Sequence, residues 1–284
     1  MSTPANFCHE IVGSMSTGAA GNPTVVMIEA AFAHHGLHWR YVNMEVPPEE
    51  LGTAVRGAKA LGFRGFNCSL PHKVTVIQHL DGLGESASVM EAVNCVVRRG
   101  DKFIGENTDG KGFLRSLTAV TDPKGKSVVM MGAGGAARAI AVELALAGIK
   151  KLTLVNRSET RGQELADLLR KKLNLDVHLV AWQGNYSVPA GTDIVINATS
   201  VGLYEPNARL NLDVDSLKPG MVAADVIGNP PRTRFIRDAE SHSCKTIDGL
   251  GMLVNQGIVG VEYWTGIEPD ATVMRLALEK ALGL

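Results

Sequence analysis

Short runs of apolar residues alternate along the chain with longer stretches in which apolar positions recur every three or four residues. The first pattern is typical of buried β-strands and the second of amphipathic helices, so their alternation predicts an α/β fold with largely parallel sheets. In the first third of the chain we expect strands at residues 9–12, 39–46 and 65–68 and helices at 25–35 and 49–61. Gly36 and Gly62 follow the two helices, where glycine commonly ends a helix.

A second series of elements begins after the polar turn TDPKGK at residues 121–126. Proline and glycine in such a turn mark a break between elements, and the apolar run SVVMM that follows predicts a buried strand. The expected elements are strands at 127–131, 151–155, 177–180, 194–197 and 222–226 and helices at 136–147, 163–172, 253–264 and 271–281. This βαβαβ series with two further strands predicts a doubly wound, Rossmann-type domain at residues 110–255.

Composition and charge narrow the class of protein. Hydrophobic residues make up 45% of the chain and charged residues 20%, near the averages of globular proteins. The formal net charge of -1 offers no excess of lysine and arginine for nucleic acid or an acidic membrane surface. No apolar run approaches the ~18 residues of a membrane-spanning helix, and the N-terminus lacks a signal-peptide pattern. We therefore expect a cytoplasmic protein that binds neither nucleic acid nor membrane.

The cysteines carry no recognisable site. Cys8, Cys68, Cys95 and Cys244 are widely spaced and form no CxxC pair. They are expected to be free thiols in a reducing compartment. His34 and His38 could place two imidazoles on one helix face, but no Glu or Cys nearby completes a zinc site. We predict no metal.

A glycine-rich turn lies between the strand expected at 127–131 and the helix expected at 136–147. Its residues are Gly132, Ala133, Gly134, Gly135 and Ala136. Glycines at such a turn let a pyrophosphate approach the backbone and rest on the amides of the helix N-terminus. Ala137 stands where the GxGxxG motif has its third glycine, so the match is to a GxGGxA variant. The turn and its setting predict a dinucleotide site.

The end of the following strand indicates which dinucleotide binds. NAD-binding domains usually have Asp or Glu there, which accepts hydrogen bonds from the ribose 2′-hydroxyl. This chain has Asn156, Arg157 and Ser158, with Arg161 one turn further on. A carboxylate would repel a 2′-phosphate, whereas a guanidinium can bind it bidentately and stack on adenine. We expect NADP as the cofactor, with NAD as the alternative that the same turn can hold.

Seven short segments resemble those of the shikimate dehydrogenase family, in the family's order from about residue 65 to 256. They are NCSLPHK, AVN, GENTDGKG, GAGGAARA, NRSETR, INATSVG and DGLGMLVNQ. The resemblance implies an N-terminal α/β substrate domain at residues 1–109 and an NADP-binding Rossmann domain at 110–255. It further implies that the C-terminal helix returns to the first domain, so that residues 256–284 complete it.

The resemblance also implies a role for individual residues. Lys73 and Asp109 match the family's catalytic pair, and oxidation of a secondary alcohol needs a proton acceptor at the hydroxyl while hydride leaves the same carbon. Polyol-binding positions are matched by Ser69, Asn94 and Gln256, whose side chains can donate and accept hydrogen bonds. Besides the glycine-rich turn and the segment at residues 156–161, four residues match cofactor positions of the family: Thr199, Val226, Gly249 and Met252.

The segment that grips the substrate carboxylate departs from the family pattern. The family has an SxS pair in an HSxSP segment, whereas this chain reads GSMSTGAAGNPT at residues 13–24. Counting back from AAFAHHGL, which should align without gaps inside a helix, places Asn22 and Thr24 at the two serine positions. Ser14 and Ser16 are the alternative, directly after the first expected strand.

A second departure is Gly228 in the segment DVIGNP, where the family usually has tyrosine. Loss of the aromatic ring should open the pocket near substituents of the substrate ring. We therefore expect an NADP-dependent dehydrogenase, monomeric or homodimeric, that interconverts 3-dehydroshikimate and shikimate or a related cyclic hydroxy acid. Quinate or aminoshikimate dehydrogenases using NAD or NADP are alternatives.

Two other classes of protein are compatible with this architecture. Folate-linked methylene dehydrogenases also join a small α/β domain to a cofactor domain, but the segments NTD and LGMLVNQ argue against them. A non-catalytic, NADP-binding sensor would fit the altered carboxylate segment. It would have no need of Lys73 and Asp109, whose presence favours an enzyme.

Overall fold

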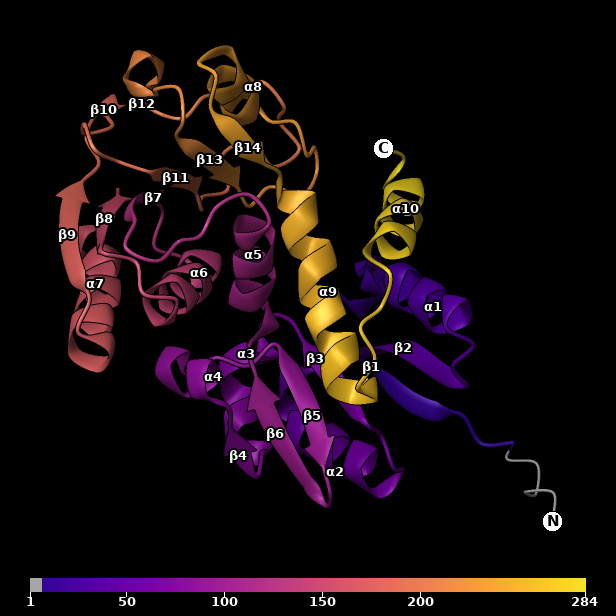
Figure 1. The fold of residues 1–284 in the computed structure, drawn as a ribbon. Helices are drawn as coiled ribbons and strands as arrows, with labels where there is room; N and C mark the ends of the chain where they lie inside the picture. Colours follow the sequence, from indigo (N-terminus) through magenta and orange to yellow (C-terminus); the bar gives the residue numbers. More distant parts are fainter. Residues whose placement is uncertain (1–6) are drawn as a thin grey trace. The chain divides into compact units, whose positions relative to one another are not determined.

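The computed structural model describes residues 7–284, and these divide into two compact units (Figure 1). The first unit ends at Asn107 and includes Gly257–Gly283, and the second spans Thr108–Gln256. One long helix, α9 (Gly249–Thr265), contributes residues to both units. None of the helices within residues 7–284 has the length and apolar character needed to cross a bilayer.

The described residues of the first unit form a six-stranded sheet in the order β2-β1-β3-β5-β6-β4. The strands are β1 (Glu10–Ser16), β2 (Trp39–Glu45), β3 (Gly65–Cys68), β4 (Gly82–Leu83), β5 (Cys95–Arg99) and β6 (Lys102–Glu106). β1 runs parallel to β2 and β3. β5 and β6 add antiparallel pairs that the apolar pattern did not predict, because a short turn at Gly100 joins them as a hairpin.

Helices pack around this sheet. They are α1 (Thr24–His34), α2 (Leu51–Ala60), α3 (His72–Thr75), α4 (Glu85–Met90) and α10 (Ala271–Leu282). In Figure 1, α10 lies beside α1, and the two are in contact. The last turns of α9 are anchored in the same unit, since the Trp264 indole donates to the carbonyl of Val96 at 3.0 Å. A core of aromatic and aliphatic side chains, including Phe66 and Phe103, fills the space beneath α2.

The second unit, all of whose residues are described, contains a six-stranded parallel sheet in the order β14-β13-β11-β7-β8-β9. Its strands are β7 (Ser127–Met131), β8 (Lys151–Asn156), β9 (Asp176–Ala181), β11 (Ile194–Asn197), β13 (Val222–Asp225) and β14 (Lys245–Ile247). Read from β9, the sequence order is 3-2-1-4-5-6, which is the doubly wound Rossmann arrangement. All six strands are parallel, but the order in which successive strands are added reverses between β7 and β11. Such folds bind their ligands at this point.

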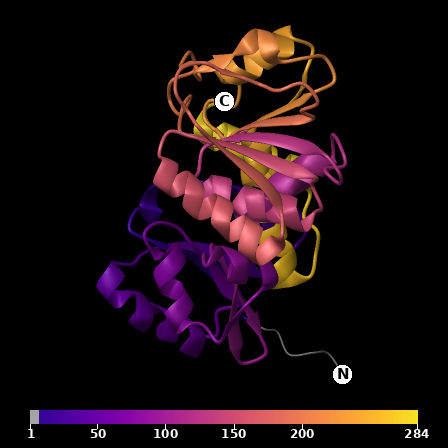
Figure 2. The same ribbon diagram turned by 90° about the vertical axis from the view of Figure 1, so that its left-hand side faces the viewer.

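Four helices belong to this unit: α5 (Thr108–Thr118), α6 (Gly135–Leu146), α7 (Glu159–Leu173) and α8 (Arg234–Ser241). Figures 1 and 2 show α7 along the face of the sheet that α6 also covers. A small two-stranded sheet, β10 (Tyr186–Ser187) with β12 (Leu212–Asp213), lies outside the main one. The predicted fold class, an α/β chain with a Rossmann-type half, is confirmed.

Candidate functional site

The glycine-rich turn connects β7 to α6, as expected from the sequence. Gly132 has φ +112°, and a Cβ at this residue would lie 2.5 Å from the carbonyl oxygen of Ala198. By contrast, a Cβ at Gly134 or Gly135 would meet no atom within 4 Å. Because no side chain caps α6, its first backbone N–H groups are available to an anion. The close approach of β11 therefore requires Gly132, while Gly134 and Gly135 leave open space.

A cleft of about 260 Å³ opens over this turn, at the ends of β7, β8 and β11. It is lined by Gly132, Ala133, Gly134, Asn156, Arg157, Arg161, Trp182, Ala198, Thr199 and Ser200. The structure thus brings together, from three separate loops, most of the residues expected to bind the cofactor. Three predicted residues, Gly135, Ala136 and Ser158, are close in sequence to lining residues but do not themselves line the cleft.

The loop after β8 has a fixed shape. The Asn156 amide donates to the carbonyl of Ser158 at 2.7 Å, and the Ser158 hydroxyl accepts from the backbone N–H of Arg161 at the start of α7. Arg157 is exposed between these two anchored residues. Within residues 7–284, the guanidinium groups of Arg157 and Arg161 make neither a hydrogen bond nor an ion pair, so their charge is available to a ligand.

A buried carboxylate supports the loop after β11. Asp225 is fully buried at the end of β13, where it accepts from Asn197 at 3.0 Å, from Thr233 at 2.6 Å and from the Ile227 N–H at 3.0 Å. Asn197 in turn accepts from the hydroxyl of Thr199 at 2.7 Å. Burial raises the pKa of Asp225 to about 6, while these hydrogen bonds act in the opposite direction. Sequence patterns did not single out Asp225, although a carboxylate in the apolar run VAAD was a signal.

Other predicted cofactor positions lie in the second unit, beside this network. Gly249 begins α9 and packs so closely on the backbone of Val226 and Ile227 that no Cβ could fit there. Met252 follows on the same helix, half-buried. α5 and α9 are also in close contact, because the backbone of Gln256 lies against Gly112.

Two predicted site residues, Gln256 and Asp109, lie close to the start of α5. The hydroxyl of Thr108 donates to the side-chain carbonyl of Gln256 at 3.3 Å. Asp109 is the next residue in the first turn of α5 and is half-buried. Asp109 and Gln256 therefore belong to the second unit, whereas Lys73, Ser69 and Asn94 belong to the first.

The first unit holds the segments of Lys73 and Asn94 together. The carbonyl of Lys73 accepts from the N–H of Val93 at 2.7 Å, and the carbonyl of Asn94 accepts from the N–H of Cys68 at 2.9 Å. Lys73 lies on the short helix α3, and Ser69 is exposed just before it. Burial raises the pKa of the Cys68 thiol to about 12, so this thiol stays protonated and is excluded as a nucleophile.

Asn22 and Thr24 lie at the start of α1. The Asn22 side chain accepts from the N–H of Thr24 at 3.0 Å, and the backbone carbonyl of Asn22 accepts from the side-chain amide of Asn43 at 3.0 Å. Asn43 also accepts from the hydroxyl of Ser14 at 2.8 Å. The sequence placed Ser14 and Ser16 after the first strand, which is wrong, because β1 continues through Ser16 and both side chains are buried. Asn43 of β2 accepts the hydrogen bond of the Ser14 hydroxyl, which offsets the cost of burying that hydroxyl.

Three family models match the chain. The shikimate dehydrogenase substrate binding domain matches residues 22–96, shikimate / quinate 5-dehydrogenase matches residues 116–250, and the shikimate 5'-dehydrogenase C-terminal domain matches residues 249–279. A shikimate dehydrogenase (NADP(+)) of Desulforamulus reducens is 39% identical over 259 residues, which is 89% of each chain.

Solved structures extend this similarity to the whole fold. The ligand-free 5-ketofructose reductase of Gluconobacter sp. strain CHM43 is 54% identical, with a TM-score of 0.95 over 97% of this chain and 100% of that one. A shikimate dehydrogenase in complex with NADP+ is 35% identical, with a TM-score of 0.87 over 96% of both chains. This chain therefore belongs to the shikimate dehydrogenase family and is an NADP-dependent oxidoreductase that acts on a CH–OH group.

Proposed function

We propose that this enzyme reduces the carbonyl group of a neutral polyhydroxy ketone of the 5-ketofructose class and catalyses the reverse oxidation. The observation that carries the proposal is the 54% identity, over nearly the full length, to a 5-ketofructose reductase. The shikimate dehydrogenases among the relatives are less similar, at 39% identity for the Desulforamulus reducens enzyme. Such a substrate has many hydroxyl groups and no carboxylate.

The polar groups around Asn22 support a neutral substrate. Ser14, Asn43 and Asn22 form a hydrogen-bonded chain of neutral polar groups that carries no positive charge. The charged group that fixes the loop ahead of Asn22 is negative, since Glu45 accepts from the N–H of Ala20 at 2.8 Å. A carboxylate only accepts hydrogen bonds, whereas sugar hydroxyls can use both kinds of partner. This environment therefore favours a polyol over an acid.

Lys73 and Asp109 are the proposed proton-transfer pair. NADPH, when bound, supplies the hydride. Lys73 would donate a hydrogen bond to the carbonyl oxygen and then deliver the proton that the new alkoxide requires, while Asp109 orients the lysine and a neighbouring hydroxyl of the substrate. Ser69, Asn94 and Gln256 would hold the remaining hydroxyls. The proposed cofactor site comprises the glycine-rich turn and its cleft, together with Val226, Gly249 and Met252.

Shikimate remains the second candidate substrate. The curated relatives are named shikimate dehydrogenase (NADP(+)), and the positions of Ser69, Asn94 and Gln256 follow that family's pattern. Quinate and aminoshikimate are ring acids of the same kind. A sensor that binds NADP without turnover would be the remaining class.

A panel of substrates separates these candidates. We would follow NADPH oxidation with 5-ketofructose, 3-dehydroshikimate and 3-dehydroquinate, and NADP reduction with fructose, shikimate and quinate. We expect kcat/KM for 5-ketofructose to exceed that for either ring acid by about 100-fold, the effect of two or three lost hydrogen bonds. A preference for a ring acid would contradict the proposed substrate, and cofactor binding without turnover of any compound would favour the sensor.

Substitutions at Asn22 and Thr24, where the chain differs from the family's serine pair, test whether these residues determine substrate preference. The double variant Asn22→Ser with Thr24→Ser recreates the family's serine pair. We expect it to move the ratio of kcat/KM for 3-dehydroshikimate over 5-ketofructose upward by about tenfold, roughly one hydrogen bond. The control is Ser14→Ala, which removes the buried hydroxyl of the alternative pair. A larger change of the ratio in Ser14→Ala than in the double variant would assign the role to Ser14.

The open space at Gly134 gives a second test, aimed at the cofactor. Gly134→Ala should leave the melting temperature within about 1 °C of wild type, because its Cβ meets no protein atom within 4 Å. The same Cβ would occupy space needed by a pyrophosphate, so the Kd for NADP should rise about tenfold or more. The matched variant Gly132→Ala should instead destabilise the fold by ~2 kcal/mol, because its φ is left-handed and Ala198 is close. Unchanged NADP affinity in Gly134→Ala would place the pyrophosphate elsewhere.

A further inference from the structure

A second cleft adjoins the proposed cofactor cleft within the second unit. It has a volume of about 160 Å³ and is lined by Arg157, Trp182, Thr199, Val201, Arg209 and Asn211. Arg157, Trp182 and Thr199 line both clefts, so the two clefts adjoin at these residues. The second cleft shares Arg157 with the proposed cofactor cleft and adds a further basic residue, Arg209.

The charged side chains that line the two clefts are all positive. Arg157, Arg161 and Arg209 line them, and no Asp or Glu is among the lining residues. In the described chain, the Arg209 guanidinium has no hydrogen-bond or ion-pair partner, as is also true of Arg157 and Arg161. Unpaired guanidinium groups that line the same cleft repel one another, and a phosphomonoester dianion would offset that repulsion.

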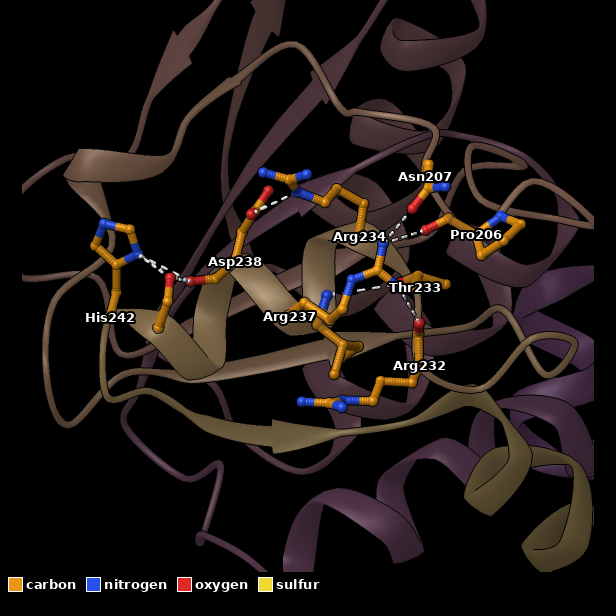
Figure 3. A network of polar contacts seen from close by, with 10 residues as sticks. Pro206, Asn207, Arg232, Thr233, Arg234, Arg237, Asp238 and His242 are labelled. Atoms are coloured by element: carbon orange, nitrogen blue, oxygen red, sulfur yellow. Dashed lines mark hydrogen bonds and ion pairs between the residues drawn. The ribbon is translucent and has the colours of Figure 1, made fainter.

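The loop that carries Arg209 is fixed on both sides. On one side, Arg237 of α8 donates to the carbonyl of Pro206 at 2.7 Å and to the side chain of Asn207 at 2.8 Å (Figure 3). On the other side, the Trp182 indole donates to the carbonyl of Asn211 at 2.9 Å. Ordering a flexible loop on binding costs conformational entropy. Because these contacts already order the loop in the unliganded protein, that cost is reduced when a ligand binds.

The same contacts orient the aromatic wall of the cleft. Because its N–H is engaged by Asn211, the Trp182 ring is held in one direction while it lines both clefts. A flat, apolar ring beside guanidinium groups suits a nucleobase next to a phosphate.

We propose that Arg209 is a specificity-determining residue for NADP. It contributes a guanidinium to the 2′-phosphate of the adenosine ribose, from a loop different from that of Arg157 and Arg161, while Trp182 packs against the adenine. This proposal rests on the assignment of the larger cleft to the cofactor. The ligand group it requires is a ribose-linked phosphomonoester, which NADP has and NAD lacks.

The test uses ligands that carry only the adenosine end of the cofactor. Titration calorimetry on the full chain would measure Kd for 2′,5′-ADP and for 5′-AMP, in wild type and in Arg209→Gln. We expect the Kd for 2′,5′-ADP to rise about tenfold, as for loss of one partly solvated charge-assisted hydrogen bond, and the Kd for 5′-AMP to change less than twofold. Unchanged affinity for both, or an equal loss for both, would overturn the proposal.

Two further variants guard the interpretation. Arg232→Gln removes an exposed arginine that pairs with Glu240 outside both clefts, and it should leave both affinities unchanged. Arg237→Met releases the loop and should weaken 2′,5′-ADP in the same direction as Arg209→Gln, by severalfold. If Arg237→Met alone weakens 2′,5′-ADP, the loop matters and Arg209 does not, which contradicts the proposal. No ketone is present in these titrations, so they can fail while the proposed reductase activity holds.

Discussion

Lys73→Ala is expected to lower kcat for ketone reduction by about 10³-fold, within the range typical of a lost general acid–base group. The fold should persist, because the backbone hydrogen bond in which the Lys73 carbonyl accepts from the N–H of Val93 is kept when the side chain is shortened. The Kd for NADP should stay within twofold of wild type, since the residues that line the cofactor cleft belong to the other unit. Stopped-flow NADPH oxidation and equilibrium titration would measure the two quantities.

Controls decide whether the loss comes from proton transfer. Lys102→Ala, at an exposed lysine of β6, should leave kcat unchanged. Asp109→Asn should lower kcat by a similar factor to Lys73→Ala, and the double variant should lose little more than either single one, because residues that act as a unit are strongly non-additive. Turnover within tenfold of wild type in Lys73→Ala, or fully additive losses, would exclude the proposed pair.

Strand prediction succeeded where apolar runs are continuous and failed where tertiary contacts decide. Strands β3, β7 and β11 coincide with the predicted ranges because they are short, buried runs. The end of β1 was predicted four residues too early, at residue 12 in place of 16, since its last residues include two serines, and the burial of Ser14 depends on a partner in β2. β14 was missed because a three-residue strand that begins with an exposed lysine has too little pattern to detect.

The candidate site divides in the same way. The glycine-rich turn and Arg157 have local signals, because a strand, a turn and a helix follow one another within a few residues. Trp182 and Arg209 have none, and Asp225 has only the signal of a carboxylate in an apolar run, since each enters the site through a separate loop or strand end. The topology of the parallel sheet brings these ends to one edge, and no short window of sequence contains that information.

Asp225 gives the prediction with the largest effect on stability. In Asp225→Asn, the side-chain carbonyl can still accept from Asn197 and Ile227, and the new amide can donate to Thr233. In Asp225→Ala, those donors lose their acceptor inside the protein. We therefore expect Asp225→Ala to be about 3 kcal/mol less stable than Asp225→Asn, measured by urea unfolding at pH 7.5. Equal stability of the two variants would mean that the buried network contributes nothing.

The pH dependence of the same position has a definite sign. The pKa of Asp225 is raised from its ordinary 3.8 to about 6, so the folded protein binds this proton more tightly than the unfolded chain. The resulting stabilisation is fully present below pH ~4 and is lost as the pH rises through ~6, a change of ~3 kcal/mol. The amide introduced by Asp225→Asn cannot ionise, so the variant stays close to the protonated state of the wild type at every pH.

Wild type and Asp225→Asn should accordingly have similar free energies of unfolding near pH 4, and the variant should become more stable by up to ~3 kcal/mol by pH 7.5. Most other carboxyl groups titrate in both proteins and cancel in the difference. If the free energies of unfolding of wild type and Asp225→Asn changed in parallel from pH 4 to 7.5, burial would not raise the pKa of the Asp225 carboxyl. A divergence in the expected direction would mean that the enzyme retains a costly buried charge, whose oxygens hold Asn197, and through it Thr199, at the edge of the cofactor cleft.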